Sequence, residues 1–352
     1  MKILILASRP LEHSGITKIE MDVIDYIGNL VDIIVACPFG FMNEYGKKLR
    51  EKNIECIDLP SKSNTIRYMK AISKLVKEKN IDKVYISGNS AMMIFEALPA
   101  SVAGSTVITH CHNTKSDYPL INYLSKPMFN LVVDKKIGVS ELASKWAYLG
   151  KNIITIPNGV DLKKFHVDFE ARDEIRASLG FEDAHVFGHI GTFNKQKNHI
   201  RLIEIFLEII RNDKDAVLLL IGDGVLKDNI KKMVDDQHIS DKVKFIDFTT
   251  EPEKYYQAID VLIMPSLHEG LCLAALEAQA CSVPTLVSDV FAKETFVTSK
   301  CQKLSLNDSN IIWAKKAISM ISTERNDMSK VFIGKRMDYD SMMSSIATVL
   351  LK

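Results

Sequence analysis

The sequence lacks any hydrophobic run long enough to cross a membrane. None of its 352 residues lies in a stretch approaching the ~20 apolar residues that a spanning helix needs. The short apolar run after Met1 is closed by Pro10 and Glu12, which is too early for a secretory signal peptide. We therefore expect a cytoplasmic protein whose only contact with a membrane would be peripheral, at the inner face.

Paired cysteines and net charge are also missing. The six cysteines form no Cys-x-x-Cys pair and most lie in apolar runs, which indicates reduced core thiols. A formal net charge of +1 gives no sign of nucleic-acid binding. However, residues 1–160 hold 20 Lys and Arg against 15 Asp and Glu. A solvated lysine-rich surface accounts for this excess, and an anionic acceptor or membrane surface is the alternative.

What the sequence does contain is a regular alternation of apolar strands and helix-period segments. Several strands are near-continuous runs of Ile, Val and Leu, typical of parallel strands covered on both faces. The strands predicted in the first half are Lys2–Ala7, Val31–Cys37, Glu55–Leu59, Lys83–Ser87, Thr106–His110, Lys136–Val139 and Ile153–Pro157. The helices predicted between them include Lys18–Ile27 and Ile66–Lys79. This order predicts a doubly wound α/β sheet.

The same pattern restarts after a turn-rich join at Pro157–Asp161. The second set of predicted strands is His185–Ile190, Ala216–Ile221, Val243–Ile246, Val261–Pro265, Pro284–Val287 and Lys303–Leu306. The helices predicted with them are His199–Arg211, Val225–Gln237, Pro252–Ala258 and Leu271–Ala280. Ligands of open α/β sheets bind beyond the carboxyl ends of the strands, so residues just after each strand are the candidates for a site.

The segment Glu269–Ala278 follows one of these strands and carries two carboxylates. Glu269 lies in the predicted loop, and Glu277 lies about two turns into the predicted helix. A helix N-terminus offers free N–H groups to a phosphate, and an ionised carboxylate can accept hydrogen bonds from both hydroxyls of a ribose. The spacing therefore suits a sugar nucleotide, although an ordinary amphipathic helix that begins near a glutamate is the simpler alternative.

This Glu-x7-Glu segment resembles the signature of the retaining, family-4 type glycosyltransferases. Four further segments are similar to that family: Val139–Ser140, Ile156–Asp161, Gly191–His199 and Ile221–Leu226. Two more, Val287–Glu294 and Lys303–Leu306, are similar to its bacterial exopolysaccharide and capsular-polysaccharide branch. The resemblance covers most of the chain.

The resemblance implies the GT-B fold, with two doubly wound Rossmann-like domains facing each other across a cleft. Residues 1–160 would bind the acceptor and residues 161–338 the nucleotide sugar. A C-terminal helix at about 339–352 would pack back on the first domain. The implied reaction moves a sugar from a UDP-sugar to a glycan or polyprenyl-diphosphate-linked acceptor, with retention at the anomeric carbon and without a metal or other cofactor.

The implied donor site draws on several loops. Lys197 would neutralise the departing diphosphate, with a solvated helix-start lysine as the alternative. Thr192 stands where the family usually has an arginine, so one hydroxyl replaces a bidentate phosphate contact. The other implied donor contacts are Gly15, Gly222, Gly224, Glu269, Gly270, Leu271 and Glu277. Gly222 and Gly224 lack the third glycine of a dinucleotide fingerprint.

A histidine at the end of the fifth strand is implied to approach the donor sugar. We assign it to His112 and keep His110 as the alternative. Together with Glu269 and Lys197, His112 completes the predicted catalytic set. The two histidines share one face of the strand, which would also suit a metal pair, but the sequence offers no third ligand.

Two charged segments have simpler explanations. Asp338-Tyr339-Asp340 spells the Asp-x-Asp metal signature of the other glycosyltransferase fold, and we interpret it as surface charge near a helix start. The cations Arg67, Lys70, Lys74 and Lys77 recur at helical spacing. They suit an anionic lipid or lipid-linked acceptor, although a solvated helix face explains them as well.

Two other functions stay open at this point. One is a non-catalytic relative that keeps the fold and acts as the partner of another transferase, which Thr192 favours. The other is a GT-B enzyme of a different kind, such as a sugar-nucleotide epimerase. The sequence leaves the sugar, the base, the acceptor and the linkage undetermined.

Overall fold

The computed structural model describes residues 1–7, 9–11, 14–116, 118–321 and 324–352. The chain divides into two compact units, which we call unit 1 and unit 2. Unit 1 comprises Met1–Pro157 and Asp340–Lys352, and unit 2 comprises Asn158–Tyr339. The division falls at Pro157, where the sequence predicted the join between two domains.

Unit 1 is built on a seven-stranded sheet in the order β3-β2-β1-β4-β5-β6-β7. Every neighbouring pair in it is parallel. Its strands are β1 (Lys2–Ala7), β2 (Asp32–Cys37), β3 (Glu55–Asp58), β4 (Lys83–Gly88), β5 (Thr106–Cys111), β6 (Lys135–Gly138) and β7 (Ile153–Thr155). The central strands β1 and β4 are almost fully buried, as expected for parallel strands with helices on both faces.

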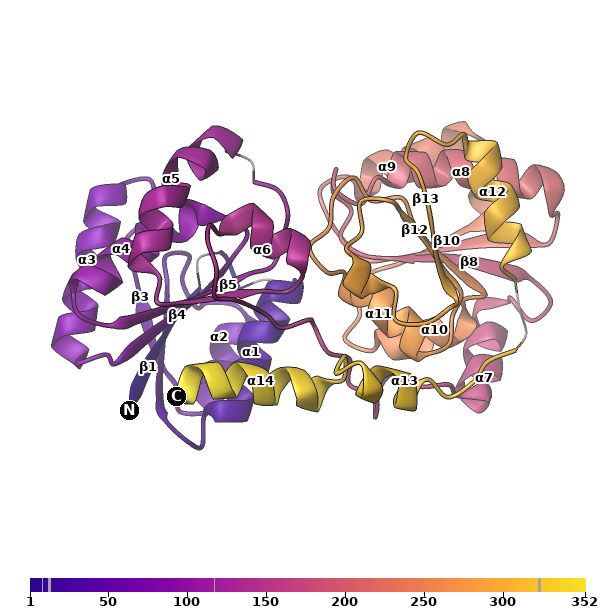
Figure 1. Cartoon of the computed structure of the whole chain (residues 1–352). Coiled ribbons are helices and arrows are strands. Elements are labelled where there is room, and N and C mark those ends of the chain that lie inside the picture. The colour runs from indigo at the N-terminus through magenta and orange to yellow at the C-terminus, as the bar shows by residue number, and fades with distance from the viewer. Residues whose placement is uncertain (8, 12–13, 117, 322–323) are drawn as a thin grey trace. The chain divides into compact units, whose positions relative to one another are not determined.

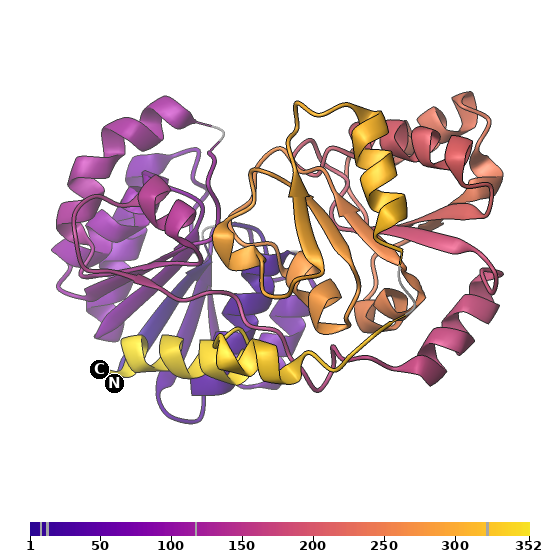
Figure 2. The same ribbon diagram turned by 45° about the vertical axis from the view of Figure 1, so that its right-hand side comes forward.

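Helices cover both faces of this sheet (Figures 1 and 2). One layer contains α3 (Thr65–Lys79), α4 (Ile94–Val102) and α5 (Pro119–Val132). The opposite face carries α1 (Gly15–Ile27), α2 (Glu44–Glu51) and the C-terminal α14 (Tyr339–Leu351). A 3-10 turn, η1 (Ala91–Met93), precedes α4, and α6 (Glu141–Ala147) follows β6.

The last helix of the chain is fastened to the N-terminal ends of two strands of unit 1. Lys83 Nζ on β4 donates to Leu350 O at 2.7 Å, and Lys135 Nζ on β6 donates to Val349 O at 2.9 Å. Both lysines therefore satisfy carbonyls of the last helical turn, which have no partner within the helix. The structure thus places α14 in unit 1, as the resemblance implied for residues 339–352.

Unit 2 repeats the architecture with a six-stranded parallel sheet in the order β10-β9-β8-β11-β12-β13. Its strands are β8 (His185–Ile190), β9 (Ala216–Ile221), β10 (Val243–Ile246), β11 (Val261–Met264), β12 (Thr285–Ser288) and β13 (Cys301–Leu304). One face carries α8 (His199–Asn212), α9 (Lys227–Asp236) and α12 (Asn310–Ser319), and the other carries α10 (Pro252–Ala258) and α11 (Leu273–Ala280) (Figure 1). The unit begins with α7 (Phe169–Leu179), and α13 (Ser329–Gly334) lies near its end. The core under α8 and α12 includes Phe187, Phe206 and Trp313, all fully buried.

The fold class predicted from the sequence is confirmed. All thirteen predicted strands are present, with ends that differ by no more than two residues. The sequence did not predict α4 and α5, and each contains a proline inside the helix, Pro99 and Pro127. Packing in the helical layer therefore overrides a residue that disfavours helix interiors. Among the described residues, no helix combines the length and the apolar character needed to cross a membrane.

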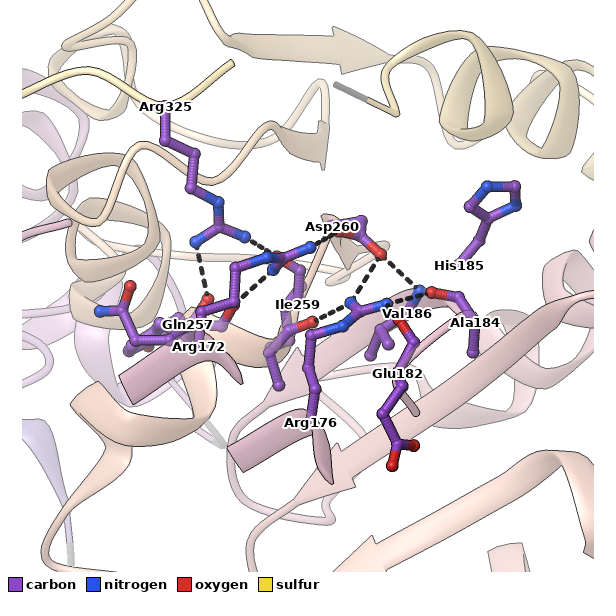
Figure 3. A network of polar contacts seen from close by, with 12 residues as sticks. Arg172, Arg176, Glu182, Ala184, His185, Val186, Gln257, Ile259, Asp260 and Arg325 are labelled. Carbon is purple, nitrogen blue, oxygen red and sulfur yellow. Dashed lines mark hydrogen bonds and ion pairs between the residues drawn. The ribbon is translucent and has the colours of Figure 1, made fainter. Parts of the chain in front are cut away.

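A buried ion network holds the start of unit 2 to the N-terminal end of β11 (Figure 3). Asp260 accepts from Arg172 and from Arg176, and also from the backbone N–H of Val186 at 2.8 Å. Arg325 donates to the carbonyls of Tyr256 and Ile259. Burial lowers the pKa of Arg325 to about 10. The network joins α7, α10 and the segment after α12, at the opposite end of β11 from the loops described below.

Glu20 on α1 gives unit 1 an expected pH dependence. The side chain is buried, and burial raises its pKa to about 8, outweighing the opposite effect of Ser87. A carboxyl with a raised pKa stabilises the folded state below its unfolded pKa of about 4.5, and this stabilisation is lost as the pH rises through about 8. We expect the free energy of unfolding to fall by on the order of 4 kcal/mol over that range, and to fall much less in Glu20→Gln. Urea unfolding at both ends of the range tests this, and parallel pH profiles for the two proteins would contradict it.

Candidate functional site

The strand order of unit 2 indicates where a ligand site should lie. β8 lies between β9 and β11, so the chain leaves β8 toward one side of the sheet and β11 leads toward the other. Open α/β sheets bind ligands beyond the carboxyl ends of the strands at such a reversal point. The relevant segments are the loop after β8, residues 191–198, and the loop after β11, residues 265–272. We call them the β8 loop and the β11 loop.

The two loops are joined by backbone and side-chain hydrogen bonds. Leu267 N donates to Gln196 O at 2.8 Å, and Asn198 Nδ2 donates to Pro265 O at 3.0 Å. Asn198 has a left-handed conformation with φ of 57°, which an asparagine tolerates better than most residues. These contacts fix the geometry between the start of α8 and the segment that leads into α11.

Lys197 and Glu269, two of the predicted catalytic residues, meet across these loops. Lys197 Nζ lies 2.8 Å from Glu269 Oε1 and 3.5 Å from Cys272 Sγ. The exposed fractions of the two side chains are only 13% and 7%, so the ion pair is largely withdrawn from water. The alternative of a solvated lysine at the helix start is therefore wrong.

The surroundings of Lys197 keep it charged. Burial alone would lower the pKa of its ammonium, but Cys272 and Glu269 outweigh burial and raise that pKa above its ordinary value. A buried, permanently positive group at the carboxyl end of the sheet suits an anionic ligand. The pair also means that an incoming phosphate would share Lys197 with a carboxylate already in place.

The glycines of the β9 turn have a structural reason of their own. Gly222 and Gly224 have φ of 137° and 150°, which L side chains rarely adopt. A Cβ on Gly222 would lie 2.3 Å from Gly191 O, and one on Gly224 would lie 2.6 Å from Phe193 O. The loops after β8 and β9 therefore pack backbone to backbone, which no larger residue allows. The glycine turn predicted for donor binding sets the position of the β8 loop.

Other predicted donor contacts lie around the same two loops. Thr192 is exposed on the β8 loop, whereas Gly270 and Leu271 are buried in the β11 loop. Leu271 O accepts from Asn158 Nδ2 at 2.8 Å, so the β11 loop is tied to the first residue of unit 2. Unit 2 thus places Thr192, Lys197, Gly270 and Leu271 at one edge of its sheet.

Glu277 lies on α11 beyond this loop. The helix begins at Leu273 rather than at the predicted Leu271, so Glu277 is one turn in rather than two. Its Oε2 accepts from the hydroxyl of Tyr256 at 2.9 Å, and Tyr256 OH also lies 3.2 Å from Ala274 O. The sequence did not identify Tyr256, because an aromatic residue at helical spacing is typical of a core position.

Two further residues that the sequence did not identify lie beneath the β8 loop. His189 and His199 are buried, with ring centroids 4.6 Å apart, and His199 stacks on Phe193 at 4.1 Å. Burial lowers the pKa of His189 to about 4 and that of His199 to about 2. Both are therefore neutral at pH 7, so Lys197 is not opposed by charged imidazoles. Their positions near the end of β8 and at the start of α8 are the feature by which the sequence could have identified them.

Unit 1 carries the remaining predicted residues. Gly15 is the first residue of α1, directly after the N-cap Ser14, whose Oγ accepts from Thr17 N at 3.2 Å. His112 follows β5 and is only partly buried, whereas His110 within β5 is fully buried. The structure therefore gives the strand-end position to His112. Gly15 and His112 belong to unit 1, whereas Lys197 belongs to unit 2.

The two neighbouring histidines differ in their contacts. His110 Nδ1 lies 2.8 Å from the hydroxyl of Tyr85, and its ring lies 4.0 Å from that of His112. Burial lowers the pKa of both rings, that of His112 to about 3. A neutral His112 can donate a hydrogen bond to a sugar hydroxyl or accept one from it. The ring of His110 packs against the ring of His112.

We therefore expect substitutions of the two histidines to separate activity from stability. His112→Ala should lower kcat by on the order of 100-fold with little effect on unfolding. His110→Ala should lower the free energy of unfolding by about 2–4 kcal/mol, because it leaves a cavity and deprives the Tyr85 hydroxyl of one of its partners. Initial rates and urea unfolding measure the two effects, and the reverse pattern would assign the catalytic role to His110.

The sequence raised two possible metal sites, one at His110 and His112 and one at Asp338–Asp340. Among the residues it describes, no group of three or more His, Cys, Asp and Glu side chains could hold a metal ion. The interpretation of Asp338 as surface charge is wrong. Asp338 is buried and forms a parallel bridge with Val160, while Tyr339 N donates to Val160 O at 2.9 Å.

Comparisons with known proteins relate the chain to glycosyltransferases. Residues 171–334 match the family model of glycosyl transferases group 1. A galactosyltransferase of Escherichia coli, named UDP-Gal:alpha-D-GlcNAc-diphosphoundecaprenol alpha-1,3-galactosyltransferase, is 26% identical over 326 residues, covering 84% of this chain and 82% of its own. A Bacillus subtilis (strain 168) protein named "Putative glycosyltransferase EpsF" is 27% identical over 72% of this chain and 70% of its own.

Solved structures of glycosyltransferase-related proteins share this fold. The crystal structure of Anabaena Alr3699/HepE in complex with UDP-glucose superposes with a TM-score of 0.80 at 17% identity and covers 99% of both chains. The two Rossmann-like units and this superposition show the GT-B fold, and the match to the group 1 model falls within unit 2. The resemblance seen in the sequence is confirmed to that extent.

Proposed function

We propose that this protein transfers a sugar from a UDP-sugar to a glycan or polyprenyl-diphosphate-linked acceptor, with retention at the anomeric carbon, in the synthesis of a surface polysaccharide. The single observation that carries the donor part is the buried Lys197–Glu269 pair at the reversal point of the unit 2 sheet. The Escherichia coli relative supports the donor and acceptor classes, since its name specifies UDP-Gal and a diphosphoundecaprenol acceptor. The Anabaena neighbour binds UDP-glucose.

In the proposed mechanism, the diphosphate binds at Lys197 and the sugar lies toward Glu269. Lys197 stabilises the negative charge that develops on the diphosphate as the bond from the anomeric carbon to the phosphate oxygen breaks. The acceptor hydroxyl forms its new bond to the same face of the carbon, and its proton passes to the departing phosphate oxygen. Glu277 would accept hydrogen bonds from the ribose, and no step requires a metal. The roles predicted for His112 and Gly15 in unit 1 remain predictions.

The stereochemical outcome is the experiment that tests this function. The purified chain is incubated with a panel of α-linked UDP-sugars and a polyprenyl-diphosphate-linked acceptor, and the anomeric coupling of the product is measured by NMR. An α-linked product supports a retaining transferase. A β-linked product would contradict retention, and a released, altered free sugar would favour the epimerase. Nucleotide binding without any turnover would favour the non-catalytic relative that Thr192 suggested.

A further inference from the structure

The helix α5 of unit 1 presents apolar side chains to solvent along its whole length. Leu124 and Leu131 have exposed fractions of 66% and 81%, which are unusual for leucines in a packed layer. The apolar residues exposed on this helix and its first flanking position are Tyr118, Leu120, Ile121, Tyr123, Leu124, Met128 and Leu131. Leu120, Leu124, Pro127 and Leu131 recur at steps of four, three and four, so they form one stripe. We call this stripe the α5 face.

The opposite side of the helix shows that this orientation is specified by the sequence. Asn122 and Phe129 are the buried residues of α5. Asn122 Oδ1 accepts from Ala91 N at 2.8 Å and thereby satisfies the start of η1. Rotating the helix to bury its leucines would remove this bond and expose Phe129. An inward polar residue and an outward row of leucines are the reverse of the usual pattern, and such contiguous patches mark interaction sites.

A row of cations lies in the same helical layer. Arg67, Lys70, Lys74 and Lys77 are all exposed on α3, and only Lys74 pairs with a described acid, Glu78 at 3.6 Å. Figures 1 and 2 show α4 between α3 and α5 on this face of the sheet. The only acid of α4, Glu96, is buried against Lys62 and Tyr68, so α4 adds no exposed negative charge.

We propose that the layer formed by α3, α4 and α5 docks on the surface of an anionic lipid bilayer, with the α5 face inserted at the headgroup boundary and the cations of α3 on the headgroups. Interfacial helices bind by burying apolar area next to basic residues that attract anionic lipid. A second copy of the chain fits less well, because a symmetric contact through this layer would bring two rows of cations together.

This assignment does not depend on the donor or the reaction. It differs from the membrane-binding segment suggested by the sequence, which was α3 alone. Here α3 supplies the positive charge and α5 supplies the apolar contact. A transferase held in this way would meet a polyprenyl-linked acceptor at the surface where the lipid lies.

Vesicle sedimentation with the full chain tests the proposal. The probes are vesicles of phosphatidylcholine with phosphatidylglycerol, and vesicles of phosphatidylcholine alone. We expect the wild-type chain to sediment with the anionic vesicles. The double variant Leu124→Asp/Leu131→Asp should bind at least about tenfold more weakly, because it removes apolar area and adds negative charge. The variant Lys70→Glu/Lys74→Glu should lose a similar factor on anionic vesicles only.

The matched control is Leu30→Asp, which changes an equally exposed leucine between α1 and β2, away from this layer. It should sediment like the wild type, and circular dichroism should show all three variants folded. Wild-type protein that stays in the supernatant would overturn the proposal. Equal binding by the Leu124→Asp/Leu131→Asp variant would do the same. A dimer in analytical ultracentrifugation that this variant dissociates, without vesicle binding, would assign the α5 face to a second copy instead.

Discussion

Replacing Lys197 with alanine should lower kcat by about 100- to 1000-fold. The ammonium is buried beside Glu269, where water screens its charge poorly, so removing it takes away a preorganised positive group from the bond-breaking step. Lys195 provides a matched control, because it is a lysine of the same loop that is exposed to solvent. Initial rates at saturating donor should fall in Lys197→Ala and remain within about twofold in Lys195→Ala.

The same substitution should also destabilise the protein, and this effect has to be separated from catalysis. Lys197→Ala breaks the buried ion pair by removing its cation, which costs about 3–5 kcal/mol in the free energy of unfolding. The double variant Lys197→Met/Glu269→Gln removes both charges and should recover most of that loss while remaining inactive. If the double variant regained turnover together with stability, Lys197 would have a structural role only.

Replacing Glu277 should chiefly impair donor binding. We expect Glu277→Ala to raise the KM for the nucleotide sugar by about 100-fold, because a charge-assisted pair of hydrogen bonds to the ribose is lost. Glu277→Gln keeps an oxygen for the Tyr256 hydroxyl but loses the charge, so its KM should lie between those of the wild type and the alanine variant. The measurement is a donor titration at fixed acceptor.

Two control variants show whether a change in the donor KM is specific to Glu277. Tyr256→Phe leaves the carboxylate in place but removes the hydroxyl that donates to it, so it should raise the donor KM by a few-fold. Glu251→Gln alters a surface glutamate that pairs only with Lys254 among the described residues, and it should change nothing. An unchanged donor KM in Glu277→Ala would remove Glu277 from the donor site.

The sequence predicted the fold well because the strands are locally specified. Runs such as Ala216–Ile221 are typical of buried parallel strands, and their restart after Pro157 indicated two sheets. The pairing of Lys197 with Glu269 could also be anticipated, since both follow strands that flank the same reversal point. Alternation predicts the doubly wound sheet, while the neighbouring positions of β8 and β11 come from the strand order of the structure.

What the sequence could not supply are contacts that depend on three-dimensional packing. Tyr256 looks like a core aromatic residue until α10 and α11 are packed and its hydroxyl meets Glu277. The glycines of the β9 turn looked like ligand contacts, yet a backbone approach to the β8 loop already requires them. The leucines of α5 resemble those of any buried helix, and it is their exposed fractions and the inward contact of Asn122 that show they face solvent.

The most direct test of the account is a calorimetric titration of the folded full chain with UDP, compared between the wild type and the Lys197→Met/Glu269→Gln variant. The account predicts saturable binding of UDP to the wild type and loss of that binding in a variant that remains folded. Equal binding of UDP by both proteins, or no binding by a folded wild type, would show that the unit 2 loops are not the donor site.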